Sequence, residues 1–164
     1  MDLTNTNNEK TNGKAGFRFA EVSDLSAIAQ LLAEDNLGAD REHLGMKGQT
    51  AYIEAFNLMR KQGDNEYLLA TGDQGQILGC LQITFIAGLS RTGMRRAQLE
   101  GVRVARKARG SGIGSILIEE ASAIARQHDC GLVQLTTDRQ RSDALRFYQS
   151  LGFEDSHRGL QRAL

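Results

Sequence analysis

Three glycines alternate at positions 110, 112 and 114, in the segment Arg109-Gly110-Ser111-Gly112-Ile113-Gly114. Because glycine lacks a Cβ atom and adopts positive φ freely, such a segment lets an anion approach backbone N–H groups closely. The residues that follow have the apolar spacing of an amphipathic helix, and a helix N-terminus carries unpaired N–H groups and a partial positive charge. The pattern therefore predicts a phosphate-binding loop at the start of a helix.

The chain around this loop is basic, although the protein as a whole is neutral. It contains 20 Lys and Arg residues and 20 Asp and Glu residues. From Arg91 to Arg109, however, seven basic residues stand against one acid, Glu100. Such clustering raises the local concentration of an anionic ligand. The overall neutrality argues against a general nucleic-acid-binding protein, which usually has a basic surplus.

Two common phosphate-binding motifs do not fit the glycine loop. The dinucleotide pattern G-x-G-x-x-G requires glycine at position 115, where this chain has Ser115. The Walker A loop ends in Gly-Lys-Ser/Thr, which is also missing here. A glycine-rich helix start without any ligand stays open as the structural alternative.

A second motif lies near the end of the chain, where residues 144–153 read ALRFYQSLGF. They match the pattern Ala-x-x-Phe-Tyr-x-x-x-Gly-Phe, and the glycine loop matches Gln/Arg-x-x-Gly-x-Gly/Ala. With both motifs spaced around a helix and a strand, the chain resembles the GNAT superfamily of acyl-CoA-dependent N-acetyltransferases over most of its length.

The resemblance implies a binding site for coenzyme A. The pyrophosphate would contact the loop backbone with Arg109 beside it, and the pantetheine arm would add to a strand as an extended peptide does. Where the family often has asparagine this chain has Arg141, which replaces that contact or reaches the phosphates. The expected cofactor-binding residues are Val102, Arg103, Val104, Arg109, Gly110, Ser111, Gly112, Ile113, Gly114, Ser115 and Arg141.

Two catalytic residues follow from the same resemblance. Tyr148 matches the tyrosine that donates a proton or hydrogen bond to the departing sulfur, and Glu100 stands where the family often places an acid facing the acceptor. An amine must lose a proton to attack a thioester, so Glu100 would act as a base, commonly through water. The structural alternatives are a solvated carboxylate for Glu100 and a core side chain for Tyr148. Direct transfer needs no acyl-enzyme, so neither Cys80 nor Cys130 is expected to act as a nucleophile.

The pattern of apolar residues predicts a single α/β domain over residues 17–164, after a flexible tail at 1–16. The resemblance further implies a mixed twisted sheet with a parallel pair splayed around the cofactor and helices on both faces. The crossover from strand through glycine loop and helix to the next strand joins parallel neighbours. The strands are expected at 17–20, 67–71, 77–86, 95–104, 132–137 and within 153–164, and the helices at 25–37, 49–61, 113–128 and 143–150.

The strand at 95–104 should position the chemistry. Its alternation places Gln98, Glu100, Val102 and Val104 on one face. Gly101 interrupts the strand, which indicates a β-bulge or a close backbone approach, and the resemblance implies the bulge. Only twelve residues follow Gly152, so the acceptor site is expected to be open or to be completed by a partner subunit. Its walls are expected from residues 37–56 and 87–96.

The resulting functional hypothesis is an enzyme that transfers an acetyl group from acetyl-CoA to a primary amine directly, within a ternary complex. The acceptor is a small-molecule amine or a protein amine, and a homodimer stays open. The alternative is a non-catalytic acyl-CoA-binding sensor or subunit of the same fold. The histidines and cysteines lack metal-ligand spacing, and no apolar run is long enough to cross a membrane. We therefore expect no metal, nucleic acid or membrane partner, and a cytoplasmic location.

Overall fold

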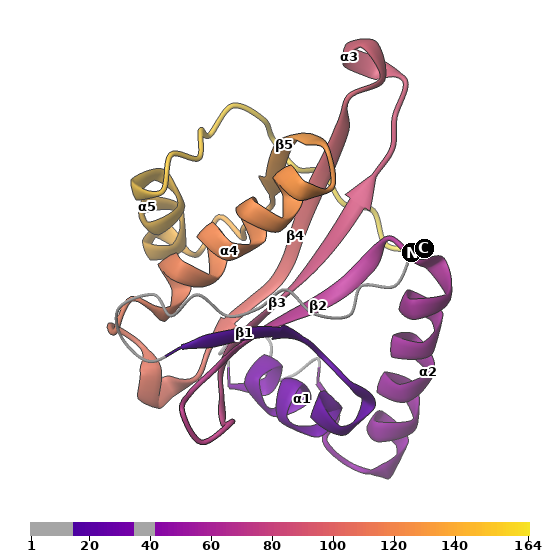
Figure 1. Ribbon diagram of the computed structural model, residues 1–164, viewed down its shortest axis with the longest axis vertical. Helices are drawn as coiled ribbons and strands as arrows, with labels where there is room; N and C mark the ends of the chain where they lie inside the picture. The colour runs from indigo at the N-terminus through magenta and orange to yellow at the C-terminus, as the bar shows by residue number, and fades with distance from the viewer. Residues whose placement is uncertain (1–14, 35–41) are drawn as a thin grey trace.

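Five strands form one sheet in the order β1-β2-β3-β4-β5, in a computed structural model that describes residues 15–34 and 42–164 (Figure 1). The strands are β1 (Gly16–Phe19), β2 (Asn65–Thr71), β3 (Ile77–Ile86), β4 (Arg95–Val104) and β5 (Cys130–Leu135). The helices are α1 (Leu25–Ala33), α2 (Met46–Gln62), α3 (Ser90–Gly93), α4 (Ile113–Gln127) and α5 (Ser142–Ser150), with 3-10 turns η1 (Val22–Asp24) and η2 (Arg106–Ala108).

The first four strands are antiparallel neighbours, and β5 pairs with β4 in parallel. This parallel pairing runs from Arg95 opposite Cys130 to Leu99 opposite Leu135 and stops there. The rest of β4, Glu100 to Val104, has β3 as its strand partner within the described part of the chain. The expected parallel pair is therefore confirmed, and beyond Leu99 the edge of β4 that faced β5 has no strand partner within the described residues; the space beside this edge is called the gap below.

The bulge expected at Gly101 is present. Gly101 has a φ of 59°, and the pairing of β3 with β4 shifts between Cys80 and Gln82, so Leu81 alone faces Gly101 and Val102. A Cβ atom on Gly101 would lie 2.9 Å from the Tyr67 hydroxyl, so glycine is required by space as well as by backbone angle.

The bulge also corrects the expected faces of β4. Gln98 and Glu100 do share a face, but the extra residue reverses the alternation that follows. Arg103 pairs with Cys80 on the face of Gln98 and Glu100, whereas Val102 and Val104 pack into the core beneath α4. The expectation that all four residues lie on one face is wrong beyond Gly101.

Helices cover both faces of the sheet, as expected: α4 and α5 lie on one side, and α1 and α2 on the other (Figure 1). Alternating strand residues supply the two cores. On the α4 side, the core includes Leu68, Leu81, Ile83 and Leu99 of the strands, which pack against Leu117 and Ile118 of α4. On the other side, it includes Leu69 and Cys80 of the strands, which pack against Ile28, Leu31 and Phe56 of α1 and α2.

Two expectations about local structure are wrong. Residues 153–164 form no strand, because they are mostly polar and have no apolar alternation to bury. The expected loop between β3 and β4 contains the short turn α3, at the tip of a hairpin that projects beyond the sheet (Figure 1). The expected tail at 1–16 lies mostly outside the described residues, and the expected end of the first helix at 37 lies wholly outside them. No helix within 15–34 or 42–164 has the length and apolar character to cross a membrane.

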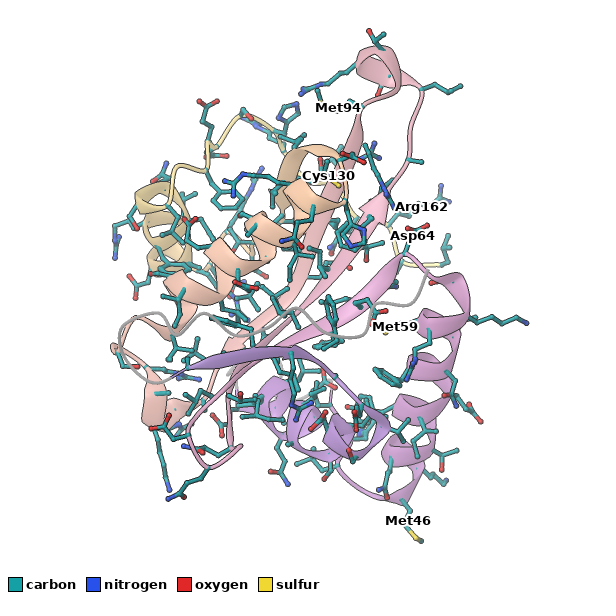
Figure 2. All side chains as sticks on the ribbon, viewed as in Figure 1. Met46, Met59, Asp64, Met94, Cys130 and Arg162 are labelled. Carbon is teal, nitrogen blue, oxygen red and sulfur yellow. The ribbon has the colours of Figure 1, made fainter. Side chains whose placement is uncertain are left out.

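An aromatic stack secures the base of this hairpin, at the end of the sheet where Asp64, Met94 and Cys130 lie (Figure 2). The His128 ring stacks on Phe85 with centroids 3.9 Å apart, and the Arg95 guanidinium lies 5.5 Å from the centre of the Phe85 ring. Arg95 also donates to the His128 carbonyl oxygen at 3.2 Å and pairs with Asp64. Burial first, and Arg95 second, lower the pKa of His128, while Asp64 and Asp129 oppose the shift.

We expect this stack to make stability depend on pH. Because the pKa of His128 is lower in the folded chain, the unfolded chain binds more protons below about pH 6.5, and stability falls as the pH is lowered through that value. His128→Phe keeps an aromatic ring on Phe85 but removes the titration. Melting temperatures at pH 7.5 and 5.5 should therefore differ less for the variant than for the parent protein. An equal difference for both proteins would contradict this role.

Candidate active site

The glycine loop presents backbone N–H groups at the start of α4. Gly110 and Gly112 have φ angles of 78° and 84°, and Gly112 is the residue that caps the helix. The helix's hydrogen bonds begin with Ile116 N–H donating to the Gly112 carbonyl oxygen at 3.2 Å. The N–H groups of Ile113, Gly114 and Ser115 therefore precede the first helical bond. No atom comes within 4 Å of a Cβ built on Gly110 or Gly112, so the space in front of the loop is open.

The third glycine of the loop has a different task. A Cβ atom on Gly114 would lie 3.2 Å from the Phe147 ring and 3.6 Å from the Val104 side chain. Its absence lets α5 and the end of β4 pack tightly against the start of α4. The sequence motif thus combines two functions, since two glycines shape the loop and the third brings the helix of Tyr148 close to it.

Tyr148 lies half-buried on α5, on the α4 side of the sheet. Its ring makes edge-to-face contacts with Phe147 and Phe153, at centroid distances of 5.2 and 5.8 Å. Burial raises the pKa of Tyr148, while the positive charges of Arg103 and Arg141 oppose this shift. A tyrosine hydroxyl with its ordinary pKa of about 10 is already protonated at neutral pH, so Tyr148 can donate a hydrogen bond.

Three of the expected cations surround the open end of β4. Arg103 belongs to β4, and Arg141 precedes α5. Arg109 is exposed and donates its Nε–H to the Val104 carbonyl oxygen at 3.2 Å, which places the guanidinium between the glycine loop and the end of β4. A positive charge therefore stands on each side of the gap through which an anionic ligand would extend.

Glu100 lies on the other face, with an exposed side chain one residue before the bulge. It neighbours a group of residues that sequence reasoning did not assign to the site. Tyr67 and Cys80 share this face, and burial raises the pKa of both, that of the Cys80 thiol to about 12. A thiol with such a pKa stays protonated, which agrees with the expectation that Cys80 is no nucleophile.

Sequence reasoning also missed a line of neutral polar side chains. The strand pairings place Asn65, Thr84, Gln98 and Gln134 next to one another across β2, β3, β4 and β5, with Gln82 in the adjacent row beside Glu100. All five are half-buried. In the sequence, each of them can be recognised only as an amide or hydroxyl residue between apolar residues of a predicted strand. That they lie side by side is shown only by the strand register.

The site therefore has two parts, one on each side of β4. Tyr148, the glycine loop, Arg109 and Arg141 lie toward α4 and α5, whereas Glu100 and the polar side chains lie toward α1 and α2. The expected acceptor wall at 37–56 lies partly outside the described residues, and the hairpin tip projects away from the sheet (Figure 1). Across residues 15–34 and 42–164, no three His, Cys, Asp or Glu side chains are grouped as a metal site would require.

A mixed sheet with one parallel pair, a bulge in the strand β4 and a glycine-rich start of the crossover helix is the arrangement that the sequence resemblance implied. The family model described as "Acetyltransferase (GNAT) family" matches residues 26–153, and the chain belongs to that family. The resemblance noted in the sequence is thereby confirmed.

Relatives named for different functions share this fold. A crystal structure of a transcriptional regulator from Bacillus halodurans C-125 is 43% identical, with a TM-score of 0.87 over 92% of this chain and 99% of that one. Glucosamine 6-phosphate N-acetyltransferase of Trypanosoma brucei brucei is 27% identical over 88% of this chain and 92% of its own length. Streptothricin acetyltransferase of Streptomyces lavendulae is 27% identical over 84% of this chain. This chain spans 63% of the length of the streptothricin enzyme.

Proposed function

We propose that this protein is an N-acetyltransferase that moves an acetyl group from acetyl-CoA to a primary amine by direct transfer. The observation that carries the proposal is the edge of β4 from Glu100 to Val104, which extends beyond the pairing of β4 with β5 and ends where Val104 and Phe147 pack beside Gly114 at the start of α4. An extended ligand with amide groups can add to such an edge as a further strand. Its phosphates would then reach the start of α4.

The residues around the gap fit coenzyme A. The open space in front of Gly110 and Gly112 suits a pyrophosphate, which would accept hydrogen bonds from the N–H groups at the start of α4. Arg109 and Arg141 add positive charge, and the backbone of residues 102–104 would bond the pantetheine amides. Arg109 already bonds the Val104 carbonyl oxygen, so its guanidinium is held where the phosphates would lie.

The proposed reaction uses one residue from each side of β4. The amine nitrogen attacks the thioester carbonyl carbon, the new C–N bond forms and the C–S bond breaks. Glu100 accepts the proton that the amine loses, directly or through water, and the Tyr148 hydroxyl donates a hydrogen bond or proton to the departing sulfur. Holding both substrates in one complex contributes a large share of the rate. The acceptor is a small-molecule or protein amine. We place the protein in the cytoplasm, where the free thiols of Cys80 and Cys130 would stay reduced.

Two measurements test this proposal. Calorimetry measures whether acetyl-CoA binds, and a thiol-release assay with a panel of primary amines measures whether the acetyl group is transferred. We expect binding together with amine-dependent thiol release. Acetyl-CoA binding without release in the presence of any amine would contradict the proposed transfer.

A second candidate is a non-catalytic sensor of acyl-CoA with the same fold. It is favoured by one observation, that the Bacillus halodurans relative is named a transcriptional regulator. The retention of both Tyr148 and Glu100 favours the enzyme. A sensor would bind acetyl-CoA and still show no thiol release with amines, so the same pair of measurements separates the two functions.

Arg109→Ala should weaken acetyl-CoA binding while leaving the fold intact. The side chain is exposed, so its loss opens no cavity. A charge-assisted hydrogen bond to a phosphate is worth roughly 1.5–3 kcal/mol, so the dissociation constant should rise by about 10- to 150-fold. Arg126→Ala, at the opposite end of α4, removes the same charge far from the loop and serves as the control. Equal dissociation constants for both variants would remove Arg109 from the binding site.

A further inference from the structure

Hydrogen bonds organise the line of polar side chains on the acceptor side of β4. Gln82 Nε2 and Thr84 Oγ1 both donate to Asn65 Oδ1, at 3.0 and 3.2 Å. Gln134 Nε2 donates to Gln98 Oε1 at 2.8 Å, across the parallel pair. These five residues, Asn65, Gln82, Thr84, Gln98 and Gln134, are called the amide row below. The row spans four strands, so its side chains are held by the sheet itself.

The direction of these bonds gives the amide row a chemical character. One N–H of the Gln82 amide, one N–H of the Gln134 amide and the Thr84 hydroxyl donate within the row, and Gln98 Nε2 donates to the Leu99 carbonyl oxygen at 3.3 Å. The carbonyl oxygens of Gln82 and Gln134 accept none of those bonds. Glu100, which pairs with Gln82, adds an exposed carboxylate. The surface therefore offers free carbonyl oxygens and the second N–H of each amide, beside the negative charge of Glu100, so it suits groups such as hydroxyls that both donate and accept hydrogen bonds.

We propose that the amide row selects the acceptor, and that the acceptor is a compact amine carrying hydroxyl or amide N–H groups, of the amino-sugar type. This inference rests on the proposed function. The acceptor's nitrogen, cationic before it loses its proton, lies toward Glu100. Its hydroxyl or amide hydrogens donate to the oxygens of the amide row.

The position of the row supports this assignment. Gln98 and Gln134 are the pair directly before Leu99 and Leu135, where β4 and β5 part. An acceptor on the row therefore lies beside the gap in which the thioester would be held. Amide and hydroxyl side chains in mid-sheet lose their water when a ligand covers them, so an acceptor without polar groups would leave them unpaired.

The positive charge of Arg96, at the far end of the row from Glu100, restricts which amines can bind there. Arg96 precedes Glu100 by four residues, about 13 Å along a strand at roughly 3.3 Å per residue. It shares the face of Gln98 and pairs with Leu132 of β5. A second ammonium group at that distance from the first would meet a positive charge. The arrangement therefore disfavours extended polyamines as well as apolar amines.

The test compares three amines in the thiol-release assay: glucosamine, cyclohexylamine and spermidine. Each is measured with the parent protein, with Gln98→Leu and with Gln134→Leu. Gln127→Leu, at the exposed end of α4, makes the same substitution away from the site and is the control. For each amine, kcat/KM of the parent protein is divided by kcat/KM of the variant. The readout is this ratio for glucosamine divided by the same ratio for cyclohexylamine. This quotient cancels differences in amine basicity, and calorimetric binding of acetyl-CoA confirms that each variant is folded.

We expect glucosamine to be the best of the three acceptors. The quotient should be about 5 or more for each site variant, as the loss of one hydrogen bond implies, and close to 1 for Gln127→Leu. A quotient of 1 for both site variants would overturn the role of the row. Faster release with cyclohexylamine or spermidine than with glucosamine would overturn the acceptor class while leaving acetyl transfer established. Release with none of the three would overturn the acceptor class, and only release with no amine of the wider panel would overturn the proposed function.

Discussion

Tyr148→Phe should lower kcat for amine acetylation by about 100-fold, the lower end of the range for general acid catalysis, and leave acetyl-CoA affinity nearly unchanged. The ring packs against Phe147 and Phe153, and phenylalanine preserves those contacts. The hydroxyl acts only when the sulfur departs, so its loss removes an interaction of the transition state and appears in kcat. The measurement combines thiol release at saturating substrates with calorimetry of acetyl-CoA.

The control for this variant is Phe147→Leu, the neighbouring position on α5. It disturbs packing against Gly114 without removing a hydroxyl. We expect it to alter acetyl-CoA affinity and stability more than Tyr148→Phe does. If Tyr148→Phe acts at the rate of the parent protein under conditions where product release does not limit turnover, the tyrosine is structural, and catalysis rests on positioning alone.

Gly112→Asp should abolish detectable acetyl-CoA binding. The side chain would extend into the open space in front of the loop, since no atom lies within 4 Å of the point that its Cβ would occupy. A carboxylate there meets the phosphates directly, and such a like-charge contact costs several kcal/mol, about 100-fold or more in the dissociation constant. Calorimetry at the concentrations used for the parent protein measures the effect.

Gly112→Asn provides a closely matched control. The φ of Gly112 is 84°, a region that strains most side chains, but asparagine and aspartate tolerate it about equally. The two variants therefore share size and backbone strain and differ in charge. We expect the asparagine variant to keep binding within about tenfold of the parent protein, since it loses no charge-assisted contact. Equal weakening by both substitutions would show that steric change, and not repulsion of phosphate, is responsible.

Local sequence signals accounted for much of the cofactor side. The glycine loop, the helix after it and the bulge at Gly101 all depend on backbone angles that only glycine adopts readily, so they can be inferred from the residues themselves. The parallel pairing of β4 and β5 followed from the order of strand, helix and strand, since a crossover of that kind joins parallel neighbours. Tyr148 was identified by its motif, and its pairing with the glycine loop through Phe147 and Gly114 became visible only in three dimensions.

The acceptor side was largely beyond sequence reasoning. Gln82, Gln98 and Gln134 are ordinary strand residues in the sequence, and nothing local distinguishes them from solvated positions. They form one surface because the register of three strand pairings aligns them. The expected face of Val102 and Val104 was wrong for the same reason, since one extra residue in β4 reverses the alternation downstream.

By itself, therefore, the sequence predicted where the chain would bind an anion and which side chain would protonate a leaving group. Those properties depend on residue type and short spacing: glycine's freedom of φ, the dipole of a helix start and the motif around Tyr148. The tertiary structure decided which side chains meet across the sheet and which face of β4 each one occupies. Strand register depends on contacts between residues far apart in the chain, and a shift of one residue moves every side chain to the opposite face.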